Sequence, residues 1–153
     1  MRILKYKIAL VSLNQIWEDK ILNWALCKEY IKNAANVGVD LIVFPEMTLT
    51  GFSFNTQSIS EDQKDSKTIE IFSQIAKKYN IAIVFGMVVG NKSKISNKSI
   101  FISSDGGIVG EYIKIHPFTL VGEDKYFNSG DKLGVFQYKS INIGLSICYD
   151  LRF

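Results

Sequence analysis

The stretch Leu41-Ile42-Val43-Phe44 is an uninterrupted apolar run of strand length, and Pro45 and Glu46 follow it directly. A strand without polar positions is typical of a sheet that is covered on both faces. A strand with one solvent-exposed face would instead alternate polar and apolar residues. A second apolar run, Tyr6–Leu13, lies near the start of the chain. The two runs together indicate a layered α/β core.

Two amphipathic helices are predicted around these strands. The first presents an apolar face made by Trp24, Cys27, Ile31, Ala34 and Ala35, widened by Leu26, Tyr30 and Val37. Gly38 is expected to end it, since glycine is common just after a helix. The second helix is predicted over about Ser66–Tyr79, with Asn80 as a left-handed stop before the strand Ile81–Val89.

After residue 90 the pattern changes to strands alone. Two hairpins are predicted, one with strands Lys98–Ser103 and Ile108–Ile115 around residues 104–107, the other with strands Leu133–Tyr138 and Ile141–Ile147 around Lys139-Ser140. The polar stretch Asn55–Asp65 is expected to be an exposed loop. The predicted order is β-α-β-α-β followed by hairpins, and residues 1–153 are expected to form one mixed α/β unit.

The scarce residues exclude several kinds of site. The chain contains one histidine, His116, and two cysteines, Cys27 and Cys148, which are too few to build a zinc site from histidine and cysteine alone, so no metal is expected. The cysteines are expected to be reduced thiols. The chain has neither a signal-peptide pattern nor an apolar run of about 18 residues. We therefore expect a cytoplasmic protein that does not contact a membrane.

The charge pattern argues against a nucleic-acid partner. The formal net charge is +3, but the basic residues are mostly scattered lysines. The cluster of Lys92, Lys94 and Lys98 contains no interleaved aromatic residues and is interpreted as a solvated hairpin tip. We expect no nucleic-acid binding.

Three polar residues stand where apolar strands are predicted to end: Glu46, Lys114 and Cys148. Strand ends are where α/β folds commonly place reacting groups. A cysteine becomes a useful nucleophile when a cation lowers its pKa and a base takes its proton, and an ammonium group can also stabilise an oxyanion. From spacing alone, an inert thiol, a solvated lysine and a surface acid remain open alternatives.

The residues around these three positions form sequence blocks. The blocks are Phe44-Pro45-Glu46-Met47 with Thr50-Gly51-Phe52, then Tyr112–Phe118, then Gly144–Phe153. In this order they resemble the signature blocks of the nitrilase, or carbon-nitrogen hydrolase, superfamily. The resemblance covers essentially the whole chain, and Pro117 departs from it because members more often have leucine there.

The resemblance implies a set of roles. Cys148 would be the nucleophile, Glu46 the general base, and Lys114 the stabiliser of the oxyanion together with the backbone N–H of Tyr149. Glu123 would be a second glutamate that positions the substrate and the lysine. The implied substrate is a small-molecule amide, hydrolysed through a thioester with no metal or organic cofactor. The blocks look most like the omega-amidase branch, which acts on monoamides of short dicarboxylates and their 2-oxo forms.

The resemblance also implies a fold, a four-layer α-β-β-α sandwich that commonly assembles into homodimers or higher oligomers. Because family members continue well beyond the nucleophile turn, we expect residues 1–153 to be the N-terminal portion of such a domain. A fragment, a split gene product and a partial sequence all remain open.

Two alternative functions stay open. The chain could be a non-catalytic remnant that needs a missing half. It could also be a Cys-His hydrolase in which His116 pairs with Cys148 and Asp150 or Glu46 orients the imidazole. The other interpretation of His116 is that it braces the loop behind Lys114, and of Asp150 and Arg152 that they form structural contacts beneath the nucleophile turn.

Overall fold

The computed structural model describes residues 5–91 and 94–153. Its main elements are, in chain order, β1 (Ile8–Leu10), α1 (Lys20–Asn36), β2 (Leu41–Val43), α2 (Thr56–Ile59), α3 (Lys67–Tyr79), β3 (Ala82–Asn91), β4 (Lys94–Ile102), β5 (Ile108–Ile113), β6 (Gly134–Tyr138) and β7 (Ile141–Leu145). Short 3₁₀ turns complete it: η1 (Gln63–Asp65), η2 (Thr119–Val121), η3 (Glu123–Lys125) and η4 (Cys148–Arg152). The predicted order, β-α-β-α-β followed by strands alone, is confirmed apart from the short helix α2, which was not predicted.

The strands form two sheets. The larger has the order β1-β2-β3-β4-β5, in which β1, β2 and β3 run parallel and β3, β4 and β5 run antiparallel. The smaller is the β6–β7 hairpin. Its turn residues Lys139 and Ser140 both have positive φ, which is the backbone of a type I′ turn and matches the predicted two-residue connection.

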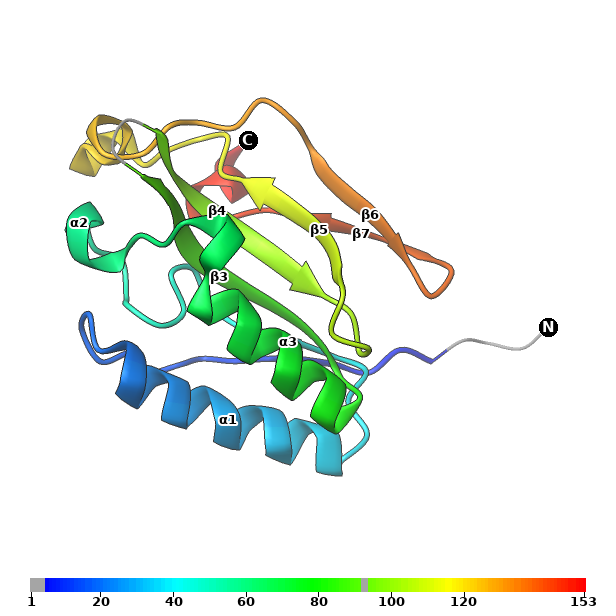
Figure 1. The fold of residues 1–153 in the computed structure, drawn as a ribbon. Coiled ribbons are helices and arrows are strands. Elements are labelled where there is room, and N and C mark those ends of the chain that lie inside the picture. The colour runs from blue at the N-terminus through cyan, green and yellow to red at the C-terminus, as the bar shows by residue number, and fades with distance from the viewer. Residues whose placement is uncertain (1–4, 92–93) are drawn as a thin grey trace.

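Figure 1 shows α1 and α3 together on one side of the large sheet and the β6–β7 hairpin on the other. On the helix side, Cys27 and Ile31 of α1 and Phe72 of α3 belong to the same buried cluster as Ile83 and Phe85 of β3. A separate cluster joins the opposite face of β2, β3 and β4 to Tyr138, Ile143 and Leu145 of the hairpin. The described chain thus contains a helix layer, a sheet and a second sheet, stacked in the order that a nitrilase-type sandwich requires.

Local sequence signals explain the ends of α3. The Ser66 hydroxyl accepts a hydrogen bond from the Ile69 N–H, which caps the first turn. Asn80 adopts the left-handed conformation with φ of 49° and ends the helix where the sequence predicts.

Two expectations about apolar faces are wrong. Leu26, Tyr30 and Val37 do not widen the buried face of α1 but are 36%, 43% and 62% exposed. In β1, Ile8 and Leu10 are 52% and 80% exposed. The reason is geometric in both cases: α1 contacts the core along one narrow line, and β1 is an edge strand that the β6–β7 hairpin leaves partly uncovered.

The stretch Asn55–Asp65 is more ordered than the expected loop, since it contains α2 and η1. Glu61 anchors it, with a side chain that pairs with Lys20 Nζ at 2.7 Å and accepts hydrogen bonds from Ser66 and Thr68 at the start of α3. Burial alone would raise the pKa of Glu61, but the hydrogen bonds from Lys20, Thr68 and Ser66 outweigh it and lower the pKa to about 2.

The lysine cluster is not a solvated tip as a whole. Lys98 is only 8% exposed, and its Nζ pairs with Glu111 at 2.8 Å. The partner lies on the neighbouring strand β5, which explains why the spacing of the lysines alone did not predict it. Lys92 lies outside the described residues.

Within residues 5–91 and 94–153, no helix combines the length and the apolar character needed to cross a bilayer.

Candidate active site

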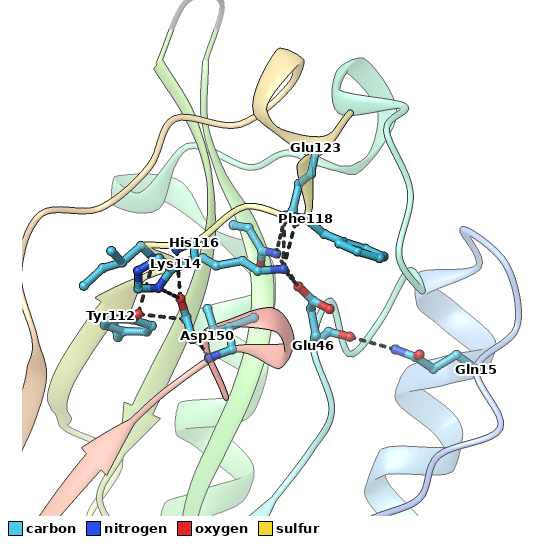
Figure 2. A network of polar contacts seen from close by, with 11 residues as sticks. Gln15, Glu46, Tyr112, Lys114, His116, Phe118, Glu123 and Asp150 are labelled. Carbon is cyan, nitrogen blue, oxygen red and sulfur yellow. Dashed lines mark hydrogen bonds and ion pairs between the residues drawn. The ribbon is translucent and has the colours of Figure 1, made fainter. Parts of the chain in front are cut away.

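Glu46, Lys114 and Cys148 lie at the ends of three strands. Glu46 follows β2 by way of Phe44 and Pro45, Lys114 comes directly after β5, and Cys148 opens η4 shortly after β7. Figure 2 shows Lys114 reaching toward both Glu46 and Glu123, so that side chains from separate segments meet at one place. The structure therefore brings the predicted residues together.

A tight elbow holds Glu46. Met47, the next residue, has a φ of 45°, which is uncommon for a residue other than glycine. The amide nitrogen of Gln15 donates to the carbonyl oxygens of Glu46, Met47 and Thr48 at 3.2, 2.8 and 3.1 Å. These three hydrogen bonds offset the cost of the unusual backbone and fix the place from which the Glu46 side chain projects.

The elbow also lies directly on β3, where a glycine makes room for it. A Cβ atom at Gly86 would lie 2.6 Å from the Met47 nitrogen and 2.9 Å from the Glu46 Cα. The Gly86 N–H donates to the Thr48 hydroxyl at 3.0 Å, and that hydroxyl donates to the Pro45 carbonyl. Glu46 is thus fixed against the rigid centre of the sheet.

Lys114 lies between two carboxylates. Its Nζ is 2.7 Å from Glu46 Oε1 and 2.8 Å from Glu123 Oε2, and the side chain is 2% exposed. Burial alone would lower the pKa of Lys114, but the hydrogen bonds and charges of Glu123 and Glu46 outweigh it and raise the pKa. Lys114 is therefore a fixed ammonium group within the site.

Glu123 is completely buried at the start of η3. Besides Lys114, it accepts hydrogen bonds from the Phe118 backbone N–H and from the side-chain amide of Asn97. Its place in the cluster agrees with the position that the family resemblance implies for it. The turn after Pro117 is folded back so that Phe118 holds this carboxylate.

Cys148 is a free, exposed thiol at the start of η4, with a φ of 47°. Lys114 lowers the pKa of Cys148, as expected of a neighbouring cation, but other effects outweigh it in the resting site. Burial of the sulfur raises the pKa of Cys148, and the negative charge of Glu46 raises it further, while the opposite effect of Lys114 is smaller. The thiol thus keeps its proton at rest and lies next to a carboxylate that can accept it.

Tyr149 follows Cys148 in the first turn of η4, where backbone N–H groups have no partner inside the helix. Its ring lies 4.8 Å from that of Phe118 and 5.7 Å from that of Phe153, measured between centroids. A cavity of about 430 Å³ lies beside the thiol, with Glu46, Ser146 and Cys148 among its lining residues.

His116 is bound to Asp150 instead of to the thiol. Its Nδ1 lies 3.0 Å from Asp150 Oδ1, its backbone N–H donates to the same oxygen at 2.8 Å, and its ring stacks on Phe153. Among the described residues, His116 makes no hydrogen bond to Cys148. This arrangement matches the bracing interpretation of His116.

Asp150 ties the nucleophile turn to β5. Its carboxylate accepts hydrogen bonds from the Tyr112 hydroxyl at 2.7 Å and from the Ile147 N–H at 3.0 Å, as well as from His116. Burial alone would raise the pKa of Asp150, but these hydrogen bonds lower it. The expected structural role of Asp150 is confirmed, whereas Arg152 is exposed, with its guanidinium 6.0 Å from the Tyr149 ring centroid.

Sequence reasoning missed Asn97 and Gln15. Asn97, in β4, is 1% exposed and donates from Nδ2 to Glu46 Oε1 at 2.6 Å and to Glu123 Oε1 at 3.0 Å. Asn97 lies one residue before the predicted strand Lys98–Ser103, so the one available signal was an amide side chain beside that strand, where a buried polar group needs a partner. Gln15 lies in a connection between β1 and α1 and carries no comparable signal.

Known proteins match this chain over most of its length. The family model described as carbon-nitrogen hydrolase matches residues 7–153. A 2-oxoglutaramate amidase from Bacillus subtilis is 31% identical over 74% of this chain and 44% of its own length. A deaminated glutathione amidase from Dictyostelium discoideum is 33% identical over 99% of this chain and 59% of its own length.

A solved structure gives the same fold. A CN-hydrolase superfamily protein from Xanthomonas campestris superimposes with a TM-score of 0.87 at 26% identity, over 95% of this chain and 54% of that one. The chain thus spans about half the length of the relatives that it matches. On the match of residues 7–153 to the family model, this chain belongs to the carbon-nitrogen hydrolase family.

Proposed function

We propose that the protein hydrolyses the terminal amide of a small carboxylic acid, with Cys148 as nucleophile, Glu46 as general base and Lys114 as oxyanion stabiliser. The observation that carries the proposal is the position of Glu46, which contacts the Lys114 ammonium at 2.7 Å and lies close enough to Cys148 to raise its pKa. The base and the cation are thus in contact with little exposure, and the exposed Cys148 thiol lies beside them.

The first half of the reaction forms a thioester. Glu46 accepts the thiol proton while the Cys148 sulfur attacks the amide carbon, and the carbonyl π electrons move onto oxygen. Lys114, with the backbone N–H of Tyr149, stabilises that oxyanion. The oxyanion then collapses, the C–N bond breaks, and the proton held by Glu46 goes to the leaving nitrogen, which departs as ammonia.

The second half releases the acid. Glu46 takes a proton from a water molecule that attacks the thioester carbon, and a second oxyanion forms at the same place. Its collapse breaks the C–S bond, and the proton returns from Glu46 to the Cys148 sulfur. In both halves Glu123 holds Lys114 from the side opposite Glu46, so that the ammonium stays in place as charge develops on the substrate.

For the substrate we propose a monoamide of a short dicarboxylate or of its 2-oxo form. The similarity to a 2-oxoglutaramate amidase supports this choice. A second carboxylate on the substrate needs a cation, and Lys114 is already engaged by two glutamates. Arg152 lies four residues after Cys148, is exposed, and makes no ion pair within the described part of the chain.

Deaminated glutathione, a larger amide, is the second candidate substrate for the same hydrolysis, because the chain is similar to a deaminated glutathione amidase. We further propose that the whole protein works in the cytoplasm as a homodimer or higher oligomer, as the family resemblance implies.

Amide hydrolysis tests the proposal, measured as ammonia release from 2-oxoglutaramate and butyramide and as release of the peptide amine from deaminated glutathione. We expect the first to be turned over with the highest kcat/KM, Cys148→Ala to abolish release, and Cys27→Ala, which changes a buried thiol in the helix layer, to retain it. Undiminished release by Cys148→Ala would contradict the mechanism. A preference for butyramide would contradict the proposed substrate class.

A further inference from the structure

Within residues 5–91 and 94–153, Asn97 is the one uncharged side chain that joins both glutamates of the site. It projects from the middle of β4, is 1% exposed, and donates to Glu46 Oε1 and to Glu123 Oε1 through the same Nδ2 atom. Lys114 contacts the same two carboxylates from the end of β5. The two carboxylates are thus connected twice, once by an ammonium group and once by a neutral amide.

The orientation of the Asn97 amide follows from its surroundings. If the group were flipped, its oxygen would face two carboxylates, which would be repulsive, so the nitrogen must point toward them. The Oδ1 atom is buried and has no hydrogen-bond partner among the described residues. A buried acceptor without a partner is costly, so the stabilising contribution of this side chain comes from its two donor contacts and not from its oxygen.

The charges of Glu46, Glu123 and Lys114 indicate what the two hydrogen bonds from Asn97 do. Glu46, Glu123 and Lys114 together carry one more negative charge than positive, and the Cys148 thiol lies against the same cluster. One ammonium cannot neutralise two carboxylates. The partial positive charge of the Asn97 amide lies on the Oε1 atom of Glu46, which the Lys114 ammonium also contacts, so both donors hold that carboxylate by the same oxygen.

We propose that Asn97 is a positioning residue that aligns Glu46 for proton transfer from Cys148. This inference rests on the proposed function, because it assigns Asn97 a part in activating the same thiol. Asn97 touches neither the sulfur nor the substrate carbon in this role and acts through Glu46. The titratable groups that face Glu46 are Lys114 after β5 and Cys148 in η4, with Glu123 in η3 behind the lysine.

The test is the pH dependence of Cys148 alkylation by iodoacetamide, located by peptide mass spectrometry. This readout needs no substrate, so it separates the inference from the proposed function. Asn97→Asp keeps the shape but replaces the donor with an acceptor, and we expect the midpoint of the alkylation rate to move upward by about one pH unit or more. Asn97→Ser, which is smaller and retains one donor, should move it in the same direction by less.

Asn23 supplies a matched control, because it is also a fully buried asparagine whose Nδ2 makes two hydrogen bonds, at 2.7 and 2.8 Å, but both go to backbone carbonyls. Asn23→Ala should lower the melting temperature and leave the alkylation midpoint where it is. If both Asn97 variants lose thermal stability while their midpoints stay at the wild-type value, Asn97 is only structural and the inference is wrong. If the midpoints move but wild-type protein releases no ammonia from any amide, the inference stands and the proposed reaction is wrong.

Discussion

Replacing Lys114 with methionine tests the charge arrangement of the site. Methionine is similar in length and fills the same space, but it removes the ammonium from between two carboxylates. The consequence is large because the group is 2% exposed, and its partners Glu46 and Glu123 are 14% and 0% exposed. Glu123 has no exposure at all, so its carboxylate cannot reach water unless η3 rearranges.

Loss of one partner from a buried ion pair typically costs about 3–5 kcal/mol, since the remaining charge is left buried and unpaired. For a chain of this size each kcal/mol corresponds to about 2–4 °C in melting temperature, so Lys114→Met should melt about 6–20 °C lower at pH 7. Differential scanning calorimetry or circular dichroism measures the shift. The deficit should shrink at lower pH, where protonation of the carboxyl groups relieves their repulsion.

A second substitution sharpens the result. In Lys114→Met, the further change Glu123→Gln removes one of the two buried charges and should restore part of the lost stability, although activity stays absent. The reasoning is refuted if Lys114→Met melts within about 2 °C of wild type, or if Glu123→Gln destabilises the variant as much as it destabilises the wild type.

Three further predictions concern other parts of the chain. Because the pKa of Glu61 is lowered to about 2 from 4.5, its stabilising effect is fully present above about pH 4.5 and is lost as the pH falls through 2. Glu61→Gln should therefore melt lower at pH 7, by an amount equivalent to about 3 kcal/mol, and converge with wild type near pH 2 in thermal scans. Gly86→Ala places a methyl group 2.9 Å from the Glu46 Cα and should reduce kcat by at least about tenfold in ammonia-release assays, whereas an unchanged kcat would show that the elbow tolerates displacement. His116→Ala should retain more activity than Lys114→Ala, and the reverse order would favour a Cys-His mechanism.

Much of the fold was predictable because the signals are local. The apolar run at 41–44, the serine cap and left-handed asparagine around α3, and the two hairpins all depend on neighbours within a few residues in the chain. The extent of burial was not predictable in this way. The exposure of Leu26 on α1 and of Leu10 in β1 depends on which elements pack against them, and the sequence of the helix or strand does not contain that information.

The candidate site likewise contains residues that could be predicted from the sequence and one that could not. Glu46, Lys114 and Cys148 were predictable from strand ends and from the blocks around them. Asn97 was not, because its partners lie 51 and 26 residues away in the chain and meet it only through the pairing of β3, β4 and β5. The direction of the Cys148 pKa was missed for the same reason, since the balance between burial, one carboxylate and one ammonium depends on distances in space.

The formation of a thioester on Cys148 is the central claim, and one measurement tests it most directly. The protein is mixed with 2-oxoglutaramate, quenched in acid during turnover, digested and analysed by mass spectrometry. We predict an acyl group on the peptide that carries Cys148, removed by hydroxylamine as the hydroxamate and absent from the peptide that carries Cys27. Ammonia release at the full rate with no acyl group on Cys148 would contradict the account.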